Sequence, residues 1–342
     1  MEKRINILDC TFRDGGYYNN YNSGYVKVYQ NILGRWVQMG ERIMGEAEND
    51  KSGTSISLSS DGKIIAIGAP ENDSFNGTNS GHVRVYKFTS GQWEQIGEDI
   101  NGPSDNDGFG YSLDISADGK VIVIGAPLAA YRNRGMVRVY ELNESEEWER
   151  ISELYCGNSQ GSGGCTLDYF RFGYDVSISD DGNIIAVGNN HYETYAEQFE
   201  TYPYVNIYKR DESSENCDPN CYTKWGESIS GKYYDGYFGS ALDLSGDGDR
   251  ILIGASEYPG NSTDTDLYRG SAFVYENING SWIKIGKDLH GENKWDYFGK
   301  KLSLSGNGKT IAIGADGYDS NLVQNIGRVY LYKYEGCDWR ET

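Results

Sequence analysis

The chain alternates short apolar stretches with polar turns, and the order of these segments repeats. Each repeat opens with alternating apolar and polar residues, as in residues 112–116, followed by Asp-Gly or Asn-Gly. A nearly unbroken apolar run comes next, as in residues 64–67, and then a second alternating segment, as in residues 83–86. Alternation with a period of two predicts a strand with one buried face, and the unbroken run predicts a strand buried on both faces.

The turn pair gives the repeat its length. Asp-Gly and Asn-Gly tolerate positive φ at both centres of a type I′ hairpin turn, so we expect that turn between the first two strands. The pair begins at residues 61, 118, 181, 247 and 307, which gives spacings of 57, 63, 66 and 60 residues. Two aromatic residues recur with the same period. A tyrosine ends the third segment, at Tyr29, Tyr86, Tyr140, Tyr208, Tyr275 and Tyr332. A tryptophan opens a fourth segment, at Trp36, Trp93, Trp148, Trp282 and Trp339, with Tyr222 in its place once.

The repeat predicts an all-β fold, a β-propeller of four-stranded antiparallel blades whose neighbours bury each other's apolar faces. Five units are nearly complete, at residues 51–102, 103–157, 158–231, 232–291 and 292–342. Residues 24–45 supply only the last two strands of another unit, and residues 5–8 are our candidate for its second strand, with Leu8 in the place of Ile65. We therefore expect six blades, the first incomplete, with seven blades as the alternative.

Two dipeptide landmarks connect the repeat to a known family. Phe-Gly pairs precede the first strand or open it, and Gly-Ala ends the second strand; the pairs are Phe109-Gly110, Phe172-Gly173, Phe238-Gly239 and Phe298-Gly299, with Gly68-Ala69, Gly125-Ala126 and Gly314-Ala315. This unit resembles the FG-GAP repeat of the integrin-alpha N-terminal propeller, over residues 23–342, although Ser52 and Asn189 depart from it. The resemblance implies a non-catalytic binding, adhesion or scaffold module that takes protein or glycan on its loop face.

The N-terminal segment carries a second resemblance. Residues 7–17, I-L-D-C-T-F-R-D-G-G-Y, are similar to the first strand of DRE-TIM metallolyases such as 4-hydroxy-2-oxovalerate aldolase, which implies metal binding by Asp14 and enolate stabilisation by Arg13. A TIM barrel needs about 250 residues of alternating strand and helix, whereas the propeller repeat occupies the chain after residue 23. We interpret residues 1–22 as an aldolase-like fragment reused as an edge strand, with a remnant of an aldolase fusion as an alternative function.

Charge narrows the range of partners. The chain has 51 acidic and 31 basic side chains, a net charge of −20, which argues against nucleic acid or an anionic membrane as partner. No apolar run approaches the roughly 18 residues of a transmembrane helix. With 45 Gly, 29 Tyr and only six Pro, the composition suits short strands and tight turns. We expect a monomer that is not inserted in a membrane.

The cysteines and glycosylation motifs leave the compartment open. Of six cysteines, two pairs lie close in sequence, Cys156 with Cys165 and Cys217 with Cys221. They allow disulfides, whereas a four-thiolate zinc site lacks the usual ligand spacing. The N-terminus shows no secretory signal, but the paired cysteines and the sequons are compatible with a surface or secreted protein; the sequons are at Asn72, Asn76, Asn143, Asn261 and Asn279.

An acidic residue precedes the Phe-Gly position of every unit and is our first candidate site. One interpretation is an axial ring of carboxylates that captures a cation or a basic group. The other is that each carboxylate accepts hydrogen bonds from its own loop amides, which the presence of an acid in every unit favours. The residues are Asp50, Asp107, Asp168, Asp235 and Asp296.

Aromatic residues of the loops are the second candidate site. Insertions at residues 156–171, 189–203 and 256–269 carry many of them, on the face we expect to bind ligands. Tyrosine offers rigid apolar area with a polar tip, so a glycan or peptide could stack there; packing within the loops is the alternative. The candidates are Tyr169, Phe170, Tyr192, Tyr195, Tyr202, Tyr233, Tyr234, Tyr237, Tyr258, Tyr268 and Trp295.

Catalytic chemistry is not evident in the sequence. No acid, base and nucleophile recur at a suitable spacing, and the three histidines, His82, His191 and His290, are isolated. We therefore predict no catalytic residues, no metal and no cofactor, with a lectin or a carbohydrate-active enzyme as the alternative function. Integrin-like calcium hairpins need D-x-D-x-D-G, whereas the hairpins here keep one carboxylate each in S-x-D-G, so calcium is only an alternative to ordinary turn chemistry.

Overall fold

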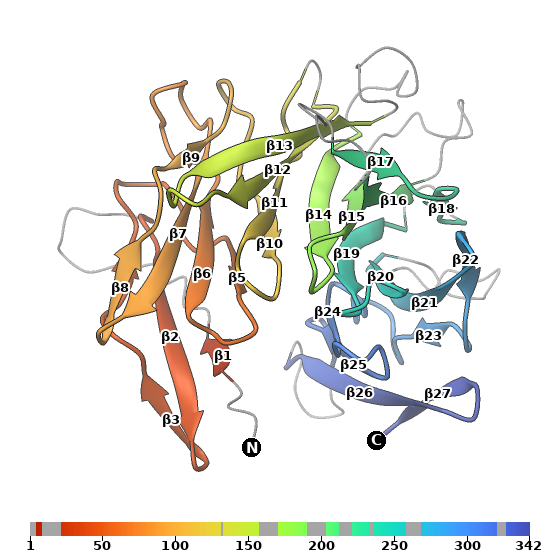
Figure 1. Cartoon of the computed structure of the whole chain (residues 1–342). Coiled ribbons are helices and arrows are strands. Elements are labelled where there is room, and N and C mark those ends of the chain that lie inside the picture. The colour runs from red at the N-terminus through yellow and green to blue at the C-terminus, as the bar shows by residue number, and fades with distance from the viewer. Residues whose placement is uncertain are drawn as a thin grey trace. The chain divides into compact units, whose positions relative to one another are not determined.

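The computed structural model describes residues 22–130, 133–156, 170–189, 203–211, 221–232, 236–257, 268–319 and 326–342, and the backbone of residues 5–8. All regular elements in these residues are β-strands, which form six small antiparallel sheets (Figure 1). Among them there is no helix of the length and hydropathy that crossing a membrane requires. The prediction of an all-β, six-bladed β-propeller is confirmed.

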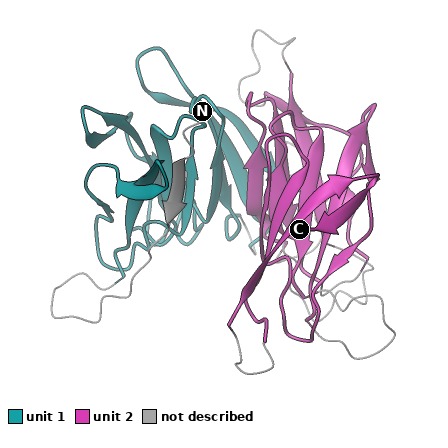
Figure 2. Ribbon diagram, turned by 90° about the horizontal axis from the view of Figure 1, so that it is seen from below, with its two compact units in different colours: residues 1–168, 218–220 teal, residues 169–217, 221–342 magenta. Residues whose placement is uncertain are grey.

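The chain divides into two compact units, which we describe separately (Figure 2). Unit 1, Met1–Asp168 with Asp218–Asn220, contains the first three blades. Blade 1 has β1 (Ile5–Leu8), β2 (Tyr25–Ile32), β3 (Arg35–Gln38) and β4 (Ile43–Met44); blade 2 has β5 (Ser55–Leu58), β6 (Ile64–Ala69), β7 (His82–Thr89), β8 (Gln92–Gln95) and β9 (Ile100–Asn101); blade 3 has β10 (Ser112–Ile115), β11 (Val121–Ala126), β12 (Met136–Leu142) and β13 (Trp148–Tyr155).

Unit 2, Tyr169–Cys217 with Cys221–Thr342, contains the other three blades. Blade 4 has β14 (Phe172–Ile178), β15 (Ile184–Asn189), β16 (Tyr204–Arg210), β17 (Tyr222–Lys224) and β18 (Ile229–Ser230); blade 5 has β19 (Phe238–Leu244), β20 (Arg250–Ala255), β21 (Ser271–Ile278), β22 (Ser281–Lys284) and β23 (Leu289–His290); blade 6 has β24 (Lys301–Leu304), β25 (Thr310–Ala315), β26 (Arg328–Glu335) and β27 (Asp338–Glu341).

The N-terminal strand β1 occupies the edge of blade 1. It pairs antiparallel with β2, so residues 5–8 take the position of a second strand. The register differs from the sequence alignment by two residues, because Asn6, and not Leu8, lies opposite Tyr29, as Ile65 lies opposite Tyr86 in blade 2. A shift of two residues keeps the same side chains on the same face of the sheet.

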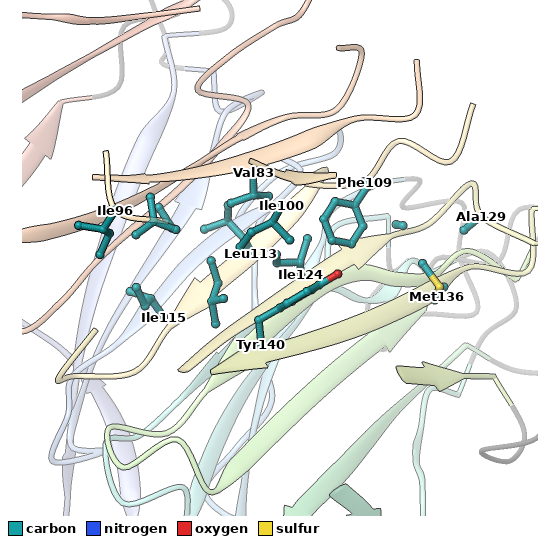
Figure 3. Close-up of a cluster of buried hydrophobic side chains, with 14 residues drawn as sticks. Val83, Ile96, Ile100, Phe109, Leu113, Ile115, Ile124, Ala129, Met136 and Tyr140 are labelled. Carbon is teal, nitrogen blue, oxygen red and sulfur yellow. The ribbon is translucent and has the colours of Figure 1, made fainter. Parts of the chain in front are cut away.

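The hydrophobic core lies between the faces of adjacent blades. Between blades 2 and 3, Val83 and Val85 pack with Phe109, Ile122 and Ile124, all nearly inaccessible to solvent (Figure 3). Corresponding clusters join blades 1 and 2 in unit 1, and blades 4 to 5 and 5 to 6 in unit 2. The unbroken apolar runs are thus buried on both faces because each one packs against two neighbours.

Polar contacts reinforce this packing. The indole N–H of Trp93 donates to the Met39 carbonyl at 2.8 Å, and that of Trp148 donates to the Ile96 carbonyl at 3.2 Å. Each bond joins a blade to the one before it, so these tryptophans pack between blades, as predicted. Inner strands are linked too: Asp243 of β19 accepts from the backbone N–H of Leu304 in β24 at 2.5 Å.

The hairpin between the first two strands differs from the predicted type I′ turn. In blade 2, Gly62 has a φ of +64° but Asp61 is not in the positive region. The Asp61 carboxylate instead accepts from Ser59 Oγ and from the Lys63 backbone N–H, both at 2.9 Å. The side chain thus stabilises the local turn, the ordinary role of Asp in such loops. Paired positive φ values occur in the hairpins that follow the third strand: Leu33-Gly34, Ser90-Gly91, Asn279-Gly280 and Gly336-Cys337.

The fourth strand is interrupted in several blades. Its two pieces, such as β8 and β9, both pair with the third strand. The break falls at Gly97, whose φ of +71° is accessible at little cost only to glycine. Blade 3 has Ser152 in the place of Gly97, and its next buried residue, Leu154, comes one residue earlier than Ile100 does in blade 2. Its fourth strand, β13, is therefore continuous and has a bulge where its pairing register shifts between Val139 and Tyr140.

Disulfide-bonded cysteines occur among the residues that the structure describes. Cys156 and Cys221 each take part in a disulfide, and Cys337 is free and exposed. Oxidised sulfur is not a zinc thiolate, so these two residues do not belong to a four-thiolate site. The aldolase-like residues Arg13 and Asp14 lie outside the described residues, and their interpretation stays a prediction.

Candidate functional site

The acids that precede the Phe-Gly position are buried beneath their loops. Asp50, Asp107 and Asp296 are 2%, 6% and 0% exposed. Asp50 Oδ2 accepts from the Ala47 N–H at 2.8 Å and from Asn72 Nδ2 at 3.0 Å, and Asp296 Oδ2 accepts from the Asn293 N–H at 2.7 Å. Burial raises the pKa of Asp107 to about 6 and also raises that of Asp296. Asp168 and Asp235 lie outside the described residues.

Four of the eleven candidate aromatic residues lie among the residues that the structure describes. Phe170 is buried, with its ring 5.6 Å from that of Tyr204, so it packs within unit 2. Tyr237 is partly buried, at the position before Phe238. Tyr268 and Trp295 come together, as described next. The remaining candidates lie outside the described residues: Tyr169, Tyr192, Tyr195, Tyr202, Tyr233, Tyr234 and Tyr258.

Tyr268, Trp295 and Tyr297 form an aromatic cluster in unit 2. The ring centroids of Tyr268 and Trp295 are 4.6 Å apart with an interplanar angle of 35°, and Tyr297 is 6.0 Å from Tyr268 and 6.4 Å from Trp295. Trp295 is 49% exposed, and the two tyrosines are partly buried. The tyrosines therefore support an indole ring that keeps about half of its surface in water.

All three residues have left-handed backbone conformations, which bulky side chains rarely adopt. Their φ values are +61°, +66° and +52°. At the same points of the repeat most of the other described residues are Asn or Gly, which suit this conformation, although Lys51, Arg171 and Tyr237 adopt it at the position of Tyr297. Tyr268 corresponds to Asn22, Asn79 and Asn133; Trp295 to Asn49 and Asn106; Tyr297 to Lys51 and Gly108.

The backbone around the cluster is the same as in those blades. Tyr297 N–H donates to the Tyr268 carbonyl at 3.2 Å, as Gly108 N–H donates to the Asn79 carbonyl at 3.3 Å and Lys51 N–H to that of Asn22 at 3.1 Å. Only the side-chain pairing changes. Asn22 with Asn49, and Asn79 with Asn106, form amide hydrogen bonds of 3.4 Å where unit 2 stacks Tyr268 on Trp295.

The exchange also changes the shape of the surface. In unit 1, Asn79, Asn106 and Gly108 line a recess of about 390 Å³ with Tyr111 and Leu128. The corresponding positions of unit 2 carry three mutually inclined rings, which present a partly exposed apolar area. Aromatic area held rigidly in water favours stacking of a ligand.

Charged groups surround the cluster. Lys300 Nζ lies 5.5 Å from the Tyr297 ring centroid and pairs with Asp316 at 2.6 Å. Burial, and then the Glu257 carboxylate, raise the pKa of the Tyr297 phenol, which therefore stays protonated at neutral pH as a hydrogen-bond donor. Lys300 and Asp316 also line a groove of about 490 Å³ along blade 6. The arrangement offers one stacking surface with donors and acceptors at its rim.

Tyr297 was absent from the candidates that the sequence suggested. It precedes Phe298 directly, just as Tyr237, which was a candidate, precedes Phe238. A position-by-position comparison of the repeats would have found it, because the residue before the Phe-Gly position is Gly108 in blade 3 and Lys51 in blade 2. An aromatic residue where glycine suits the backbone is the signal.

Comparison with known proteins identifies the fold but no family. The sequence matches no known family profile and no curated protein. Solved structures match over nearly the whole chain, at 12% identity. A periplasmic gluconolactonase of Pseudomonas aeruginosa has a TM-score of 0.61, with 98% of this chain and 81% of that chain covered. A putative 6-phosphogluconolactonase of Bacteroides uniformis has a TM-score of 0.62, with 100% and 82% covered, and one of Bacteroides fragilis has 0.59, with 99% and 81% covered.

These neighbours correct part of the expected resemblance. They support a β-propeller over the whole chain, which is the part of the expectation that holds. They are described as lactonases, and none of the three is described as an FG-GAP or integrin-like protein. An identity of 12% carries the fold alone, because propellers host many unrelated functions.

Proposed function

We propose that this protein binds carbohydrate at the aromatic cluster formed by Tyr268, Trp295 and Tyr297. The observation that carries the proposal is the conflict between side chain and backbone at these positions. Left-handed φ values cost bulky residues about 1–3 kcal/mol each, and blade 3 avoids this cost with Asn106 and Gly108. Retaining three aromatic rings there is explained by a ligand that stacks on them.

The chemistry around the rings favours a sugar over other stacking ligands. A sugar ring presents C–H groups to an aromatic face and hydroxyls to its surroundings. Lys300, Asp316 and the Tyr297 phenol supply donors and an acceptor at the rim. The net charge of −20 disfavours nucleic acid, whose bases also stack. The fold neighbours named for sugar lactones agree with a carbohydrate ligand.

The first prediction concerns Trp295→Asn, which installs the residue that blades 2 and 3 use. We expect sugar affinity to fall by up to about tenfold, since one aromatic stacking contact contributes up to about 1.5 kcal/mol. We expect the thermal midpoint to stay the same or rise, because Asn suits the left-handed backbone. A glycan array identifies the sugar, and calorimetric titration with that sugar gives both affinities.

The matched control is Trp36→Ala in β3, since Trp36 is 44% exposed but lies outside the cluster. It should leave sugar affinity unchanged. Unchanged affinity in Trp295→Asn would contradict the proposal. An array on which no glycan binds would also overturn it and would favour the protein-binding module implied by the FG-GAP resemblance. Turnover of glucono-1,5-lactone that Trp295→Asn abolishes would extend the proposal from a lectin to a carbohydrate-active enzyme.

A further inference from the structure

A second polar site lies in unit 1, apart from the aromatic cluster and independent of the proposed function. It is a pocket of about 350 Å³ beside blade 2, which we call the acidic pocket. Its lining includes five carboxylates and one histidine: Glu46, Glu48, Asp50, Asp73, Asp99 and His82. With Arg84, which pairs with two of the acids, the formal charge of the site is −5 + 1 = −4 for a neutral histidine.

His82 is the unusual member of the acidic pocket. It is 4% exposed and its backbone is paired in β7, yet its imidazole makes no hydrogen bond to any residue that the structure describes. Its nearest acidic oxygen, Asp99 Oδ2, is 3.9 Å from Nδ1, beyond hydrogen-bonding distance. Burial and the neighbouring Arg84 lower the pKa of His82, while Asp99, Glu46 and Asp50 raise it less. A buried imidazole without a hydrogen-bond partner has a ring nitrogen that is free to bind a metal ion.

Glu46, His82 and Asp99 come from three segments and converge. One ligand atom of each lies within 4.8 Å of the other two. From this geometry we propose that Glu46, His82 and Asp99 bind a divalent transition-metal ion such as Zn²⁺ or Mn²⁺. One imidazole and two carboxylates suit these ions, whereas Ca²⁺ prefers an all-oxygen set.

Arg84 orients the two carboxylates. Its Nη2 donates to Glu46 Oε2 at 2.8 Å and to Asp99 Oδ2 at 2.7 Å, and its Nε donates to Asp99 Oδ1 at 2.8 Å. Glu46 Oε1 accepts no hydrogen bond among the described residues, and carboxylate oxygens keep a second lone pair. Ligating carboxylates are commonly held by such hydrogen bonds. The other acids of the pocket offset the repulsion between a guanidinium and a metal ion.

Blade 6 provides an internal comparison. His82 pairs with Ala69 in blade 2, and Arg328 pairs with Ala315 at the same point of blade 6. Arg328 donates to Glu292 at 2.8 Å and to Glu341 at 3.0 Å. Glu292 follows Gly291 as Glu46 follows Gly45. Blade 6 therefore has an arginine at the place where blade 2 has His82, and the arginine of blade 2, Arg84, lies two residues further along β7. A metal ion bound at His82 would supply the positive charge that Arg328 supplies at this place in blade 6.

The test is calorimetric titration of the metal-free full-length chain with ZnCl₂, MnCl₂ and CaCl₂. We expect one saturable site for Zn²⁺ or Mn²⁺, with weaker binding of Ca²⁺. His82→Ala and Glu46→Gln should each lower the affinity for the transition-metal ion by at least about tenfold. Glu46 is half-exposed, so Glu46→Gln remains informative if His82→Ala fails to fold. The matched control, His191→Ala, should leave the affinity unchanged.

Spectroscopy adds a readout that is independent of affinity. Co²⁺ bound to an imidazole and two carboxylates should give visible absorption bands that His82→Ala alters. The absence of a saturable site for both Zn²⁺ and Mn²⁺ would overturn the proposal. Binding that both His82→Ala and Glu46→Gln leave unchanged would also overturn it, and would assign the metal to a different part of the chain. None of these outcomes affects the carbohydrate proposal.

Discussion

At Trp295 and Tyr297 the backbone has a conformation that bulky side chains disfavour. The loop requires left-handed φ values, because Tyr297 N–H must reach the Tyr268 carbonyl to join adjacent blades. In blade 3 the same requirement is met by Asn106 and Gly108, which adopt the conformation readily. The side chains in unit 2 are therefore not explained by the loop alone, and this difference is the basis of the proposed carbohydrate site.

Asp107 allows a prediction about pH. Burial raises its pKa from 3.8 to about 6 in the folded protein, so the folded state holds this proton more tightly than the unfolded chain. Its contribution to stability is complete below pH 3.8 and is lost as the pH rises through about 6. We expect Asp107→Asn to raise the thermal midpoint by a few degrees at pH 7.5, and to raise it less at pH 4.5.

The measurement is thermal unfolding of both proteins between pH 4 and pH 8, followed by circular dichroism. Asp61→Asn is a suitable comparison, because Asp61 is exposed in a hairpin and accepts bonds that an amide oxygen can also accept. The difference in thermal midpoint between Asp61→Asn and the wild type should not increase with pH as the difference for Asp107→Asn does. A constant difference for Asp107→Asn across the range would contradict the prediction.

Sequence reasoning found two of the three cluster residues and missed the histidine of the acidic pocket. Tyr268 and Trp295 were recognisable as aromatic residues in loops. His82 looked isolated because its partners lie 36 residues before it, at Glu46, and 17 residues after it, at Asp99. Only the pairing of β7 with β9 and the loop after β4 bring the three together, so spacing along the chain gave no indication of the site.

Among the strands, adjacent blades approach closely at the glycine of two Gly-Ala endings, Gly68 and Gly254. A Cβ atom on Gly254 would lie 2.1 Å from the Gly299 carbonyl oxygen, and one on Gly68 would lie 2.2 Å from that of Gly110. No side chain fits there without moving a strand of the next blade. The Phe-Gly and Gly-Ala landmarks are thus two sides of one contact between blades.

This contact predicts a difference between two equivalent substitutions. Gly254→Ala should lower the free energy of unfolding by about 2–3 kcal/mol, because the methyl group meets backbone of blade 6. Gly314→Ala should change it by less than about 1 kcal/mol, since a Cβ there lies 3.4 Å from its nearest neighbour, the Lys301 carbonyl oxygen. Urea unfolding of both variants provides the comparison. Equal losses would show that the close approach does not limit this position.

The strands themselves were predictable, and the interruptions were less so. Period-two alternation and unbroken apolar runs located the first three strands of each blade, because burial acts directly on these residues. The two-residue register shift of β1 was not predictable, since a slip of two residues leaves the period-two alternation of a strand unchanged. The split fourth strand depends on the φ of Gly97, and the sequence shows the glycine without showing its conformation.

At the scale of the whole molecule, the charge of −20 is the dominant electrostatic feature. Several acids also lie close together in the acidic pocket. Mutual repulsion of like charges destabilises a compact chain and is screened by salt. The fold tolerates this because its stability comes from apolar surfaces buried between blades, which charge does not weaken directly.

Salt should therefore stabilise the protein at neutral pH. We expect the thermal midpoint at pH 7.5 to rise by several degrees between 10 mM and 500 mM NaCl, because screening reduces repulsion in the folded state. The sequence pI is about 4.6, so the same comparison at pH 5 should show a smaller rise. Differential scanning calorimetry measures both. A midpoint that falls with salt at pH 7.5 would mean that attractive ion pairs outweigh the net repulsion.

The repeat made the fold class predictable because a period of about sixty residues leaves few architectures. Function was less accessible, since it depends on where blades differ. The FG-GAP resemblance followed from the shared residues, Phe-Gly and Gly-Ala, which the structure uses for contacts between blades. Such residues report on packing, and so the resemblance indicated the propeller without identifying the ligand.

The common loop backbone of units 1 and 2 has a consequence for engineering. Because the hydrogen bond from Gly108 to Asn79 matches the one from Tyr297 to Tyr268, the scaffold accepts either set of side chains at these three points. Transplanting the rings as Asn79→Tyr, Asn106→Trp and Gly108→Tyr would then create a second receptor for the same ligand on one polypeptide. Three substitutions would thus change the number of ligand-binding sites on the chain.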